Sequence, residues 1–544
     1  MSASGRHAVM GVLADNPLLL LFLVVGLGAA LGRVRVRGIG LGPAAALFVG
    51  LAFSAADSDL ANTPSIIPTL GLALFIYTIG LASGPSFVEG FRQGGARVVV
   101  GAVLVLGAIA GVVAIVIGVL DLDVGARAGL YAGTQTNTPA LQAALQALDS
   151  DITAGVVTDP VVGYSIAYPF GVLAMIAAAH WSMRRANRPG PHGEPPAAAS
   201  TARTNATSWT VEIVRSGLPP LGDLRHWADE LLAFSRVEHD GDVDLATNAT
   251  TLVPGDLCTV IGAPEAVAHF TDWAGRRSER HLALDRQKLD FRRVSVSNRS
   301  LAGEHLRSLD LEGRFGATVT RVRRGDADLV ADSDFTLRLG DRLRVVGPVD
   351  RMGEIASLFG DSDRSLGEVD AMGFALGMAI GLLIGVISVP LPGGGAIELG
   401  VGGGPLVAGL VLGTISRTGP ITWQVPHAAN LTLRQLGILM FLGGVGIRSG
   451  ATFADSVATA TGAKLAVGAL VVSIVTAVSA ALLVKLVRSD PITAAGQLSG
   501  FQTQPAVLAF ATERSNGDER VDSGYALVFP VAIVVKLILV QLLL

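Results

Sequence analysis

The sequence predicts an α-helical polytopic membrane protein made of two inverted repeats with two small α+β cytoplasmic domains inserted between them. Each repeat is expected to hold five transmembrane helices and one broken, re-entrant helix. Uneven charge, ten apolar runs and an internal repeat predict this fold. Only 16% of the 544 residues are charged, whereas a soluble domain carries about 25%. Residues 191–370 are 28% charged and the rest about 10%, so two apolar flanks surround a soluble block.

The net charge and the cysteine content exclude several protein classes. A formal charge of −4 and 50% hydrophobic residues exclude a disordered chain, a wholly soluble protein and a nucleic-acid binder driven by positive charge. The single cysteine, Cys258, permits no intrachain disulfide and no cysteine-based zinc site. We predict that Cys258 is a small core residue.

Each flank, residues 1–186 and residues 368–544, contains five apolar runs. A helix needs about 20 mostly apolar residues to cross the hydrocarbon core of a bilayer. The runs are 17–32, 40–56, 67–84, 97–120 and 160–181, then 371–389, 403–416, 434–450, 463–487 and 524–543. The polar start of the chain leads directly into the first run, so we expect no cleavable signal peptide.

The charges between these runs predict their orientation. Arginines follow the first, third and fifth runs, and aspartates occupy the intervening loops. Because positively charged loops face the cytoplasm, the N-terminus is predicted to lie outside and the soluble block in the cytoplasm. The arginines are Arg33, Arg35, Arg37, Arg92, Arg97, Arg184, Arg185 and Arg188.

The two flanks repeat one another. Residues 70–87 (LGLALFIYTIGLASGPSF) align without a gap with residues 436–453 (LGILMFLGGVGIRSGATF), at an offset of 366. Because each unit has an odd number of crossings, the second is inverted relative to the first, an arrangement suited to alternating access. Three further matches follow the same order: Gly42-Pro43 with Gly404-Pro405, Gly133–Pro139 with Gly500–Pro505, and Gly163-Tyr164…Pro169 with Gly524-Tyr525…Pro530.

Two polar segments, 129–148 and 496–512, are predicted to enter and leave the membrane on the same side. A full crossing by the first would place the soluble block outside, against the distribution of arginines. Backbone groups cannot stay unpaired in lipid, so broken helices line protein or a watery cavity.

The polar stretches of these two segments are the predicted substrate site. Proline removes a backbone donor and disfavours helix at the residue before it. A helix that begins after each break directs its positive dipole end at the break, which suits a carboxylate. The alternative interpretation is an ordinary polar loop at the membrane surface. The candidate substrate-binding residues here are Thr134, Gln135, Thr136, Asn137, Thr138, Pro139, Gln502, Thr503, Gln504 and Pro505.

Three candidates lie outside the breaks. Arg448 stands where the first repeat has Ala82, and it is interpreted either as a bidentate carboxylate ligand or as an anchor that snorkels to the membrane surface. Ser83 and Ser449 are equivalent positions of the repeat and complete the candidate set.

Two other features of the apolar runs have alternative interpretations. Lys536 lies among apolar residues and either neutralises substrate charge or snorkels. The pairs Gly80…Gly84 and Gly446…Gly450 have the spacing of closely packed membrane helices, which explains them better than ligand contact.

The soluble block is predicted to consist of a linker and two similar modules. Residues 187–206 are rich in Pro, Gly, Ala and Thr. Modules at 207–280 and 287–362 close with related segments that turn at Gly-Asp, including Gly340-Asp341. We expect small α+β domains that serve regulation or dimerisation. No dinucleotide-binding glycine motif, P-loop, metal-binding pattern or catalytic constellation stands out, so we expect no enzyme, no cofactor and no metal.

The segment Ile79–Phe87, the Gly133–Pro139 motif, the matching second half and the two central modules resemble the aspartate:alanine exchanger family of bacterial secondary transporters. The modules are similar to the C-terminal regulatory (RCK_C, TrkA-C) domains of potassium-transport gating proteins. The resemblance implies a transporter of the bacterial inner membrane, a homodimer, that exchanges aspartate for alanine or carries dicarboxylates.

Together, the residues and the resemblance predict an antiporter of small carboxylates that works in the lipid bilayer, with a possible small-molecule regulator on the cytoplasmic modules. The alternative function is an ion channel or ion transporter gated by those modules, although no filter motif supports it. A membrane enzyme is disfavoured because paired acid and base groups are lacking.

Overall fold

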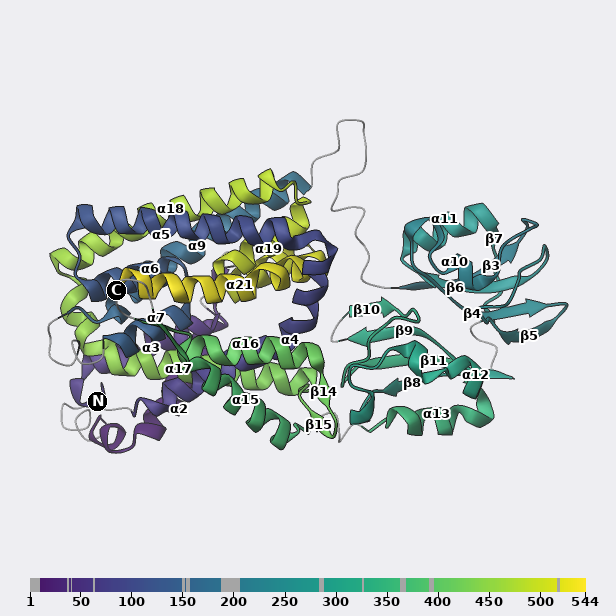
Figure 1. The fold of residues 1–544 in the computed structure, drawn as a ribbon, viewed down its shortest axis with the longest axis horizontal. Helices are drawn as coiled ribbons and strands as arrows, with labels where there is room; N and C mark the ends of the chain where they lie inside the picture. Colours follow the sequence, from purple (N-terminus) through teal and green to yellow (C-terminus); the bar gives the residue numbers. More distant parts are fainter. Residues whose placement is uncertain are drawn as a thin grey trace. The chain divides into compact units, whose positions relative to one another are not determined.

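The computed structural model describes residues 10–36, 39–40, 42–61, 64–148, 152, 157–186, 206–282, 288–324, 327–362, 368–390, 396–515 and 519–544. The chain forms two compact units. The membrane unit comprises Met1–Ala198, Phe374–Thr414 and Asn430–Leu544, and the soluble unit comprises Ala199–Gly373 and Ile415–Ala429. Figure 1 shows the first as a helical bundle and the second as two small folds of sheet and helix. The prediction of a polytopic membrane protein with an inserted soluble block is confirmed.

Ten apolar helices of the described chain coincide with the ten predicted runs. Six are long and apolar enough to cross a membrane: α4 (Ile66–Gly90), α5 (Ala96–Leu120), α9 (Pro160–Ala186), α17 (His427–Val457), α18 (Ala460–Leu486) and α21 (Glu519–Leu543). Four are shorter: α2 (Pro17–Gly32), α3 (Ala45–Ala56), α15 (Ala371–Gly385) and α16 (Gly400–Ile415). Helix α15 ends before the predicted boundary because β12 (Ser388–Pro390) pairs with β13 (Ala396–Glu398).

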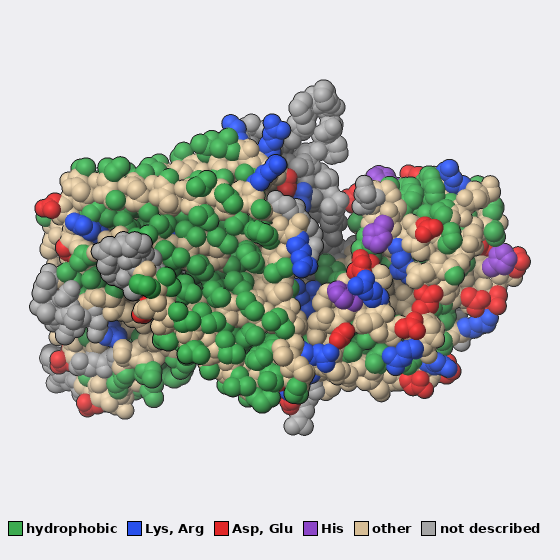
Figure 2. Space-filling model, in the orientation of Figure 1, with side chains coloured by type: hydrophobic (Ala, Val, Ile, Leu, Met, Phe, Trp, Pro, Cys, Tyr) green, Lys and Arg blue, Asp and Glu red, His purple; other side chains and the backbone are tan. Residues whose placement is uncertain are grey.

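The membrane unit presents an apolar surface. Figure 2 shows hydrophobic side chains covering its side, with few charges among them. On α5, Leu104, Ile115 and Val119 are 69%, 68% and 79% exposed. Water would not tolerate such a surface on a soluble protein, so these side chains face lipid.

Equivalent helices of the two halves run antiparallel, as an inverted repeat requires. Helix α5 packs along α18, which is its counterpart in the second half (Figure 1). Gly101, near the start of α5, faces Leu483, near the end of α18. Gly468, near the start of α18, faces Val116 and Leu120 at the end of α5. The two halves are therefore related by inversion.

Glycines hold the other helices of the two halves close together. Gly71 and Gly437 are equivalent in the repeat. A Cβ added to Gly71 would lie 2.7 Å from Gly437 O, and a Cβ added to Gly437 would lie 2.6 Å from Gly71 O. The small-residue pairs behave likewise: a Cβ on Gly80 of α4 would approach Leu406 O of α16 to 2.7 Å, and one on Gly446 of α17 would approach Leu47 O of α3 to 2.3 Å. The prediction that these glycines serve close packing is confirmed.

Replacing Gly446 with valine is expected to destabilise the membrane unit. The new Cβ would meet a backbone atom, which cannot move aside as a side-chain tip can, and overpacking of this kind costs about 1–3 kcal/mol. Thermal unfolding in detergent should show a lower Tm for Gly446→Val. The matched control is Gly111→Val on α5, where an added Cβ meets nothing within 4 Å; equal Tm values for the two variants would contradict the packing role.

The soluble unit contains two modules with the same strand order. The first has β3 (Thr207–Ile213), β4 (Leu232–His239), β5 (Asp242–Leu245), β6 (Leu257–Gly262), α11 (Pro264–Ala274) and β7 (Gly275–Arg277), in sheet order β5-β4-β6-β3-β7. The second has β8 (Leu289–Ser295), β9 (Thr318–Arg324), β10 (Ala327–Val330), β11 (Arg342–Pro348) and α13 (Met352–Phe359), in sheet order β10-β9-β11-β8. Each module has its own apolar core, and Cys258 is buried in the first, as predicted.

The Gly-Asp motifs form the turns expected of them. Gly255 and Gly340 have positive φ, +100° and +91°. The carboxylate of Asp256 accepts from Val253 N at 2.9 Å, and that of Asp341 accepts from Arg338 N at 2.8 Å. Asp256 also bonds to His239 Nδ1 at 2.6 Å, and this hydrogen bond raises the pKa of His239 above its ordinary value.

The ion pair of His239 and Asp256 predicts a pH-dependent contribution to stability. Because the pKa of His239 is raised by folding, the pair stabilises fully below the unfolded pKa of about 6.5 and its contribution is lost as pH rises through the raised value. The Tm difference between wild type and His239→Gln should therefore be larger at about pH 5.5 than at about pH 8. His281→Gln, at an exposed histidine, is the control; a pH-independent difference for His239→Gln would contradict the assignment.

Candidate functional site

Each half contains two short helices separated by an unwound break at the predicted polar motif. In the first half, α6 (Val124–Thr134) and α7 (Thr138–Ala147) flank residues 135–137; in the second, α19 (Pro491–Gln502) and α20 (Pro505–Arg514) flank residues 503–504. Thr136 and Thr503 have φ of +46° and +58°, a left-handed conformation that costs a non-glycine residue about 1–3 kcal/mol. Backbone that is strained at the same point of both repeats marks a candidate site.

Side-chain caps start the helix after each break. Asn137 Oδ1 accepts from Ala140 N at 2.8 Å, and Gln504 Oε1 accepts from Ala506 N at 3.1 Å. These caps satisfy amide groups at the N-termini of α7 and α20 that have no partner within the helix. The positive ends of both helix dipoles therefore lie at the breaks.

Both broken elements enter and leave on one side, as predicted. Thr158 N, just before α9, donates to Asp123 Oδ1 at the start of α6 (3.2 Å). The neighbouring Asp159 lines a cavity together with Gln146 near the end of α7, so the start of α6 and the end of α7 both lie near the start of α9. In the second half, Arg520 near the start of α21 pairs with Asp490, which caps the start of α19.

The two breaks contact each other directly. Thr136 Oγ1 donates to Gln502 O at 2.7 Å. Thr503 Oγ1 donates to the same oxygen at 2.6 Å and lies 3.5 Å from Gln135 O. Gln502 Nε2 donates to Thr134 O at 2.8 Å. All five residues are buried. Polar backbone freed by one break is thus paired by the other break rather than by lipid or water.

Neighbouring helices hold the breaks in place. Gln135 Nε2 donates to Thr476 Oγ1 of α18 at 3.0 Å, and Gln504 Nε2 donates to Tyr168 OH of α9 at 2.6 Å. Thr138 Oγ1 lies 3.4 Å from Tyr164 OH, also of α9. The sequence reading missed both tyrosines and Thr476 as site residues. The Gly163-Tyr164…Pro169 match between the repeats was the available signal for the tyrosines.

Lys536 of α21 also reaches the breaks, so it does not snorkel to the membrane surface. Its side chain is 0% exposed, and Nζ donates to Gln135 O at 2.9 Å and lies 3.4 Å from Thr503 Oγ1. Sequence reasoning left Lys536 outside the candidate set. The available signal in the sequence was a single lysine within an apolar run. Only the structure shows that the Lys536 side chain points toward the breaks.

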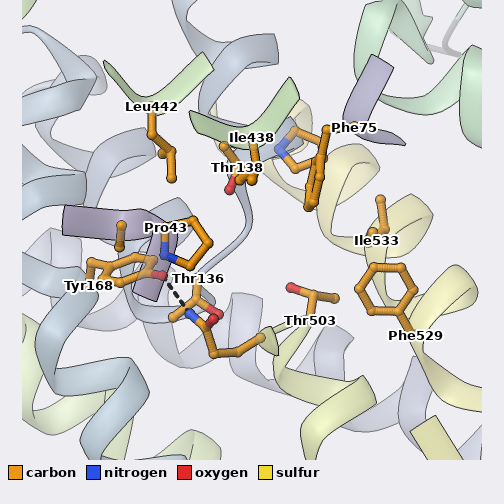
Figure 3. A pocket seen from close by; sticks show the side chains of 13 residues that line it. Pro43, Phe75, Thr136, Thr138, Tyr168, Ile438, Leu442, Thr503, Phe529 and Ile533 are labelled. Carbon is orange, nitrogen blue, oxygen red and sulfur yellow. Dashed lines mark hydrogen bonds between the residues drawn. The ribbon is translucent and has the colours of Figure 1, made fainter. Parts of the chain in front are cut away.

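A small central cavity lies beside the breaks. Its volume is about 30 Å³, space for one or two waters. Figure 3 shows Ile438, Leu442 and Phe75 across the cavity from Thr136 and Thr503, and the dashed hydrogen bond of Tyr168 with Gln504. The lining residues are Pro43, Ala44, Phe75, Thr136, Thr138, Pro139, Tyr168, Ile438, Leu442, Thr503, Gln504, Phe529 and Ile533. The walls must separate before an amino acid or dicarboxylate fits.

The cavity lies between two groups of helices within the membrane unit. The break bundle consists of α5, α6, α7, α9, α18, α19, α20 and α21, which pack mainly on one another. The glycine bundle consists of α2, α3, α4, α15, α16 and α17, joined by the close glycine contacts. The break bundle supplies the polar wall, and the glycine bundle supplies Phe75, Ile438 and Leu442.

Arg448 and Ser449 lie at a different cavity from the breaks. They line a space of about 380 Å³ together with Asp159 and Gln142. Helix α7 connects the two cavities, because its first turn lines the central cavity and its later turns line the second. Ser83 is half-buried in α4 and lines neither of these cavities.

Comparison with known proteins decides the family. The Asp-Al_Ex family, described as "Predicted Permease Membrane Region", matches residues 20–183 and 373–544, and the TrkA-C domain matches residues 291–360. The chain belongs to the aspartate–alanine exchanger family. The two matched membrane regions are the two repeats of the chain, and the TrkA-C match covers its second soluble module.

The chain is similar along its whole length to several bacterial relatives named only as uncharacterized transporters. One from Geobacter sulfurreducens is 41% identical over 98% of this chain and 99% of its own length. Others from Corynebacterium efficiens and Symbiobacterium thermophilum are 39% and 40% identical, each over 98% of this chain and over 99% and 98% of their own lengths. No solved structure matches the chain. The protein is thus a membrane transporter.

The hydrogen bond between Tyr168 and Gln504 is expected to couple the break to α9. Removing one partner leaves a buried polar group unsatisfied, which costs about 1–3 kcal/mol. In a double-mutant cycle of Tyr168→Phe and Gln504→Ala, the Tm loss of the double variant should be smaller than the sum of the losses of the two single variants. Tyr77→Phe is the control, because the buried Tyr77 hydroxyl has no hydrogen-bond partner among the residues that the structure describes; additive losses for the Tyr168 cycle would contradict the coupling.

Proposed function

We propose that this transporter is an antiporter of small carboxylates, either amino acids such as aspartate and alanine or dicarboxylic acids, that works by alternating access. The observation that carries the proposal is the direct contact of the two unwound breaks, through Thr136 and Gln502, at a buried point of an inverted repeat. In secondary transporters, broken half-helices that meet in this way form the substrate site.

The chemistry of the central cavity favours an anion. Two helix N-termini begin at the breaks, and each presents a positive dipole end. The ammonium of Lys536 lies next to the hydroxyl of Thr503. Asn137 stands between the lining residues Thr136 and Thr138, and its buried Nδ2 has no hydrogen-bond partner among the described residues, so it offers a donor to a carboxylate once the cavity opens. None of the described lining residues is acidic.

Movement of one bundle against the other supplies alternating access. The central cavity has one wall from each bundle, so sliding or rocking of the break bundle opens it. Because the two halves are inverted copies, exchanging their conformations moves the opening from one face of the membrane to the other. Exchange of an anionic amino acid for a neutral one would move charge, so the membrane potential would affect its rate.

The soluble modules supply regulation in this proposal. The connection between α16 and α17 belongs to the soluble unit: Arg417 pairs with Glu304 of the second module at 2.8 Å, and Leu339 N donates to Gln424 Oε1 at 3.4 Å. A change in the second module is therefore passed along the chain to the glycine bundle. A cleft of about 890 Å³ between the modules, lined by Arg225, Arg307 and Glu312 among others, offers a site for a small regulator.

The proposed setting is the bacterial inner membrane, with the soluble modules in the cytoplasm. The arginine-rich connections support this orientation. A homodimer is proposed on the resemblance to the family alone.

Reconstituted vesicles test the proposed function. Purified exchanger in proteoliposomes should take up radiolabelled aspartate only when alanine, aspartate or a dicarboxylate is loaded inside. Asn137→Ala and Gln504→Ala should each lower the exchange rate about tenfold, since a hydrogen bond to a charged group contributes about 1.5–3 kcal/mol.

Two controls make the assay decisive. Tyr77→Phe, which removes a hydroxyl without a hydrogen-bond partner, should exchange at the wild-type rate. Equal uptake into empty and loaded vesicles would refute antiport, and normal exchange in both alanine variants would exclude the breaks as the substrate site. Single-channel currents would favour the alternative of a gated ion channel.

A further inference from the structure

Lys536 places its amino group at the ends of two half-helices. Gln135 is the C-cap of α6 and Thr503 is the C-cap of α19. Lys536 Nζ bonds to the main-chain oxygen of the first and lies 3.4 Å from the hydroxyl of the second. The negative ends of both helix dipoles therefore face one ammonium group, the most favourable sign for a charge at this position.

The oxygen atoms around Nζ are of the kind that binds an alkali cation. In broken-helix transporters, unwound backbone carbonyls and half-helix C-termini coordinate the coupling ion. Here a carbonyl from an unwound segment and a threonine hydroxyl fill that role. Two more buried oxygens of the same breaks, Gln135 Oε1 and Gln502 Oε1, have no hydrogen-bond partner among the residues that the structure describes.

Only one half of the repeat supplies this charge. When Pro169 of α9 is aligned with Pro530 of α21, the residue of the first half that is equivalent to Lys536 is Met175, which is 1% exposed. Among the residues that the structure describes, no carboxylate oxygen lies within 4.0 Å of Lys536 Nζ. Backbone and hydroxyl oxygens, rather than an acidic side chain, hold the ammonium in the membrane unit.

We propose that the Lys536 ammonium is a built-in cation that replaces a bound alkali ion and clamps the two breaks together. Exchange then requires neither sodium nor potassium. Removing the side chain leaves an oxygen-lined space that a small cation can enter. The transport readout rests on the proposed function, whereas cation binding by a Lys536 variant does not.

The test is chemical rescue of Lys536→Ala. The wild-type exchange rate should be the same in choline-based buffer as in sodium buffer. In choline-based buffer, the exchange rate of Lys536→Ala should be lower than that of wild type by about tenfold or more, as expected for loss of a charged hydrogen-bond donor. Sodium chloride or ethylammonium chloride should restore part of the lost rate. Met175→Ala, which opens a space at the equivalent position of α9, should show no rescue by either salt.

Thermal unfolding gives a readout independent of transport. A cation at concentration c that binds only the folded state stabilises it by RT ln(1 + c/Kd), so sodium or ethylammonium should raise the Tm of Lys536→Ala above the shift seen with choline. Wild type and Met175→Ala should show no such excess. This result stands even if carboxylates prove not to be substrates.

A second variant keeps the proposal testable if Lys536→Ala does not fold. Lys536→Met fills the space without charge, so it should fold, exchange poorly and gain nothing from added cations. The proposal is overturned if wild-type exchange depends on sodium, if Lys536→Met exchanges normally, or if a folded Lys536→Ala responds to cations no more than Met175→Ala does.

Discussion

The pairing of one unwound break with the other is the interaction on which the rest of this structure depends. A membrane helix can be interrupted only if the freed backbone groups find partners inside the protein. Here Thr136 and Thr503 adopt left-handed backbone conformations. The hydroxyl of Thr136 donates to Gln502 O at the opposite break, and the hydroxyl of Thr503 donates to the same oxygen and lies 3.5 Å from Gln135 O. The inverted repeat makes this possible because it brings two copies of one motif to the same point from opposite directions. The polar site is therefore a consequence of symmetry.

Close backbone packing lets the remaining helices support that site. Gly71 and Gly437 face each other where the repeats meet, and Gly80 and Gly446 bring α4 and α17 against short helices of the opposite half. Such contacts favour association in lipid, where apolar burial alone does not. The result is an apolar bundle that covers one wall of the central cavity and a polar bundle that forms the other. A boundary between two well-packed groups is a natural plane of movement.

The sequence predicted the elements of this fold better than the directions of their side chains. Long apolar runs, arginine-rich connections and proline-interrupted polar motifs report where helices lie and break, and all ten runs became helices. The side that each helix buries is harder to predict. Helix α21 is apolar around its whole circumference, so no periodicity showed that Lys536 points inward. Arg448 and the breaks both carry carboxylate-binding chemistry, yet packing places them at separate cavities joined by α7.

A structure of the transporter with a bound substrate tests the central claim most directly. Cryo-electron microscopy in lipid nanodiscs with saturating aspartate should show the ligand between the two breaks, with a carboxylate at the N-terminal end of α7 or α20 and the walls of the central cavity moved apart. Density for aspartate confined to the cavity of Arg448, with the breaks still closed on each other, would contradict this account.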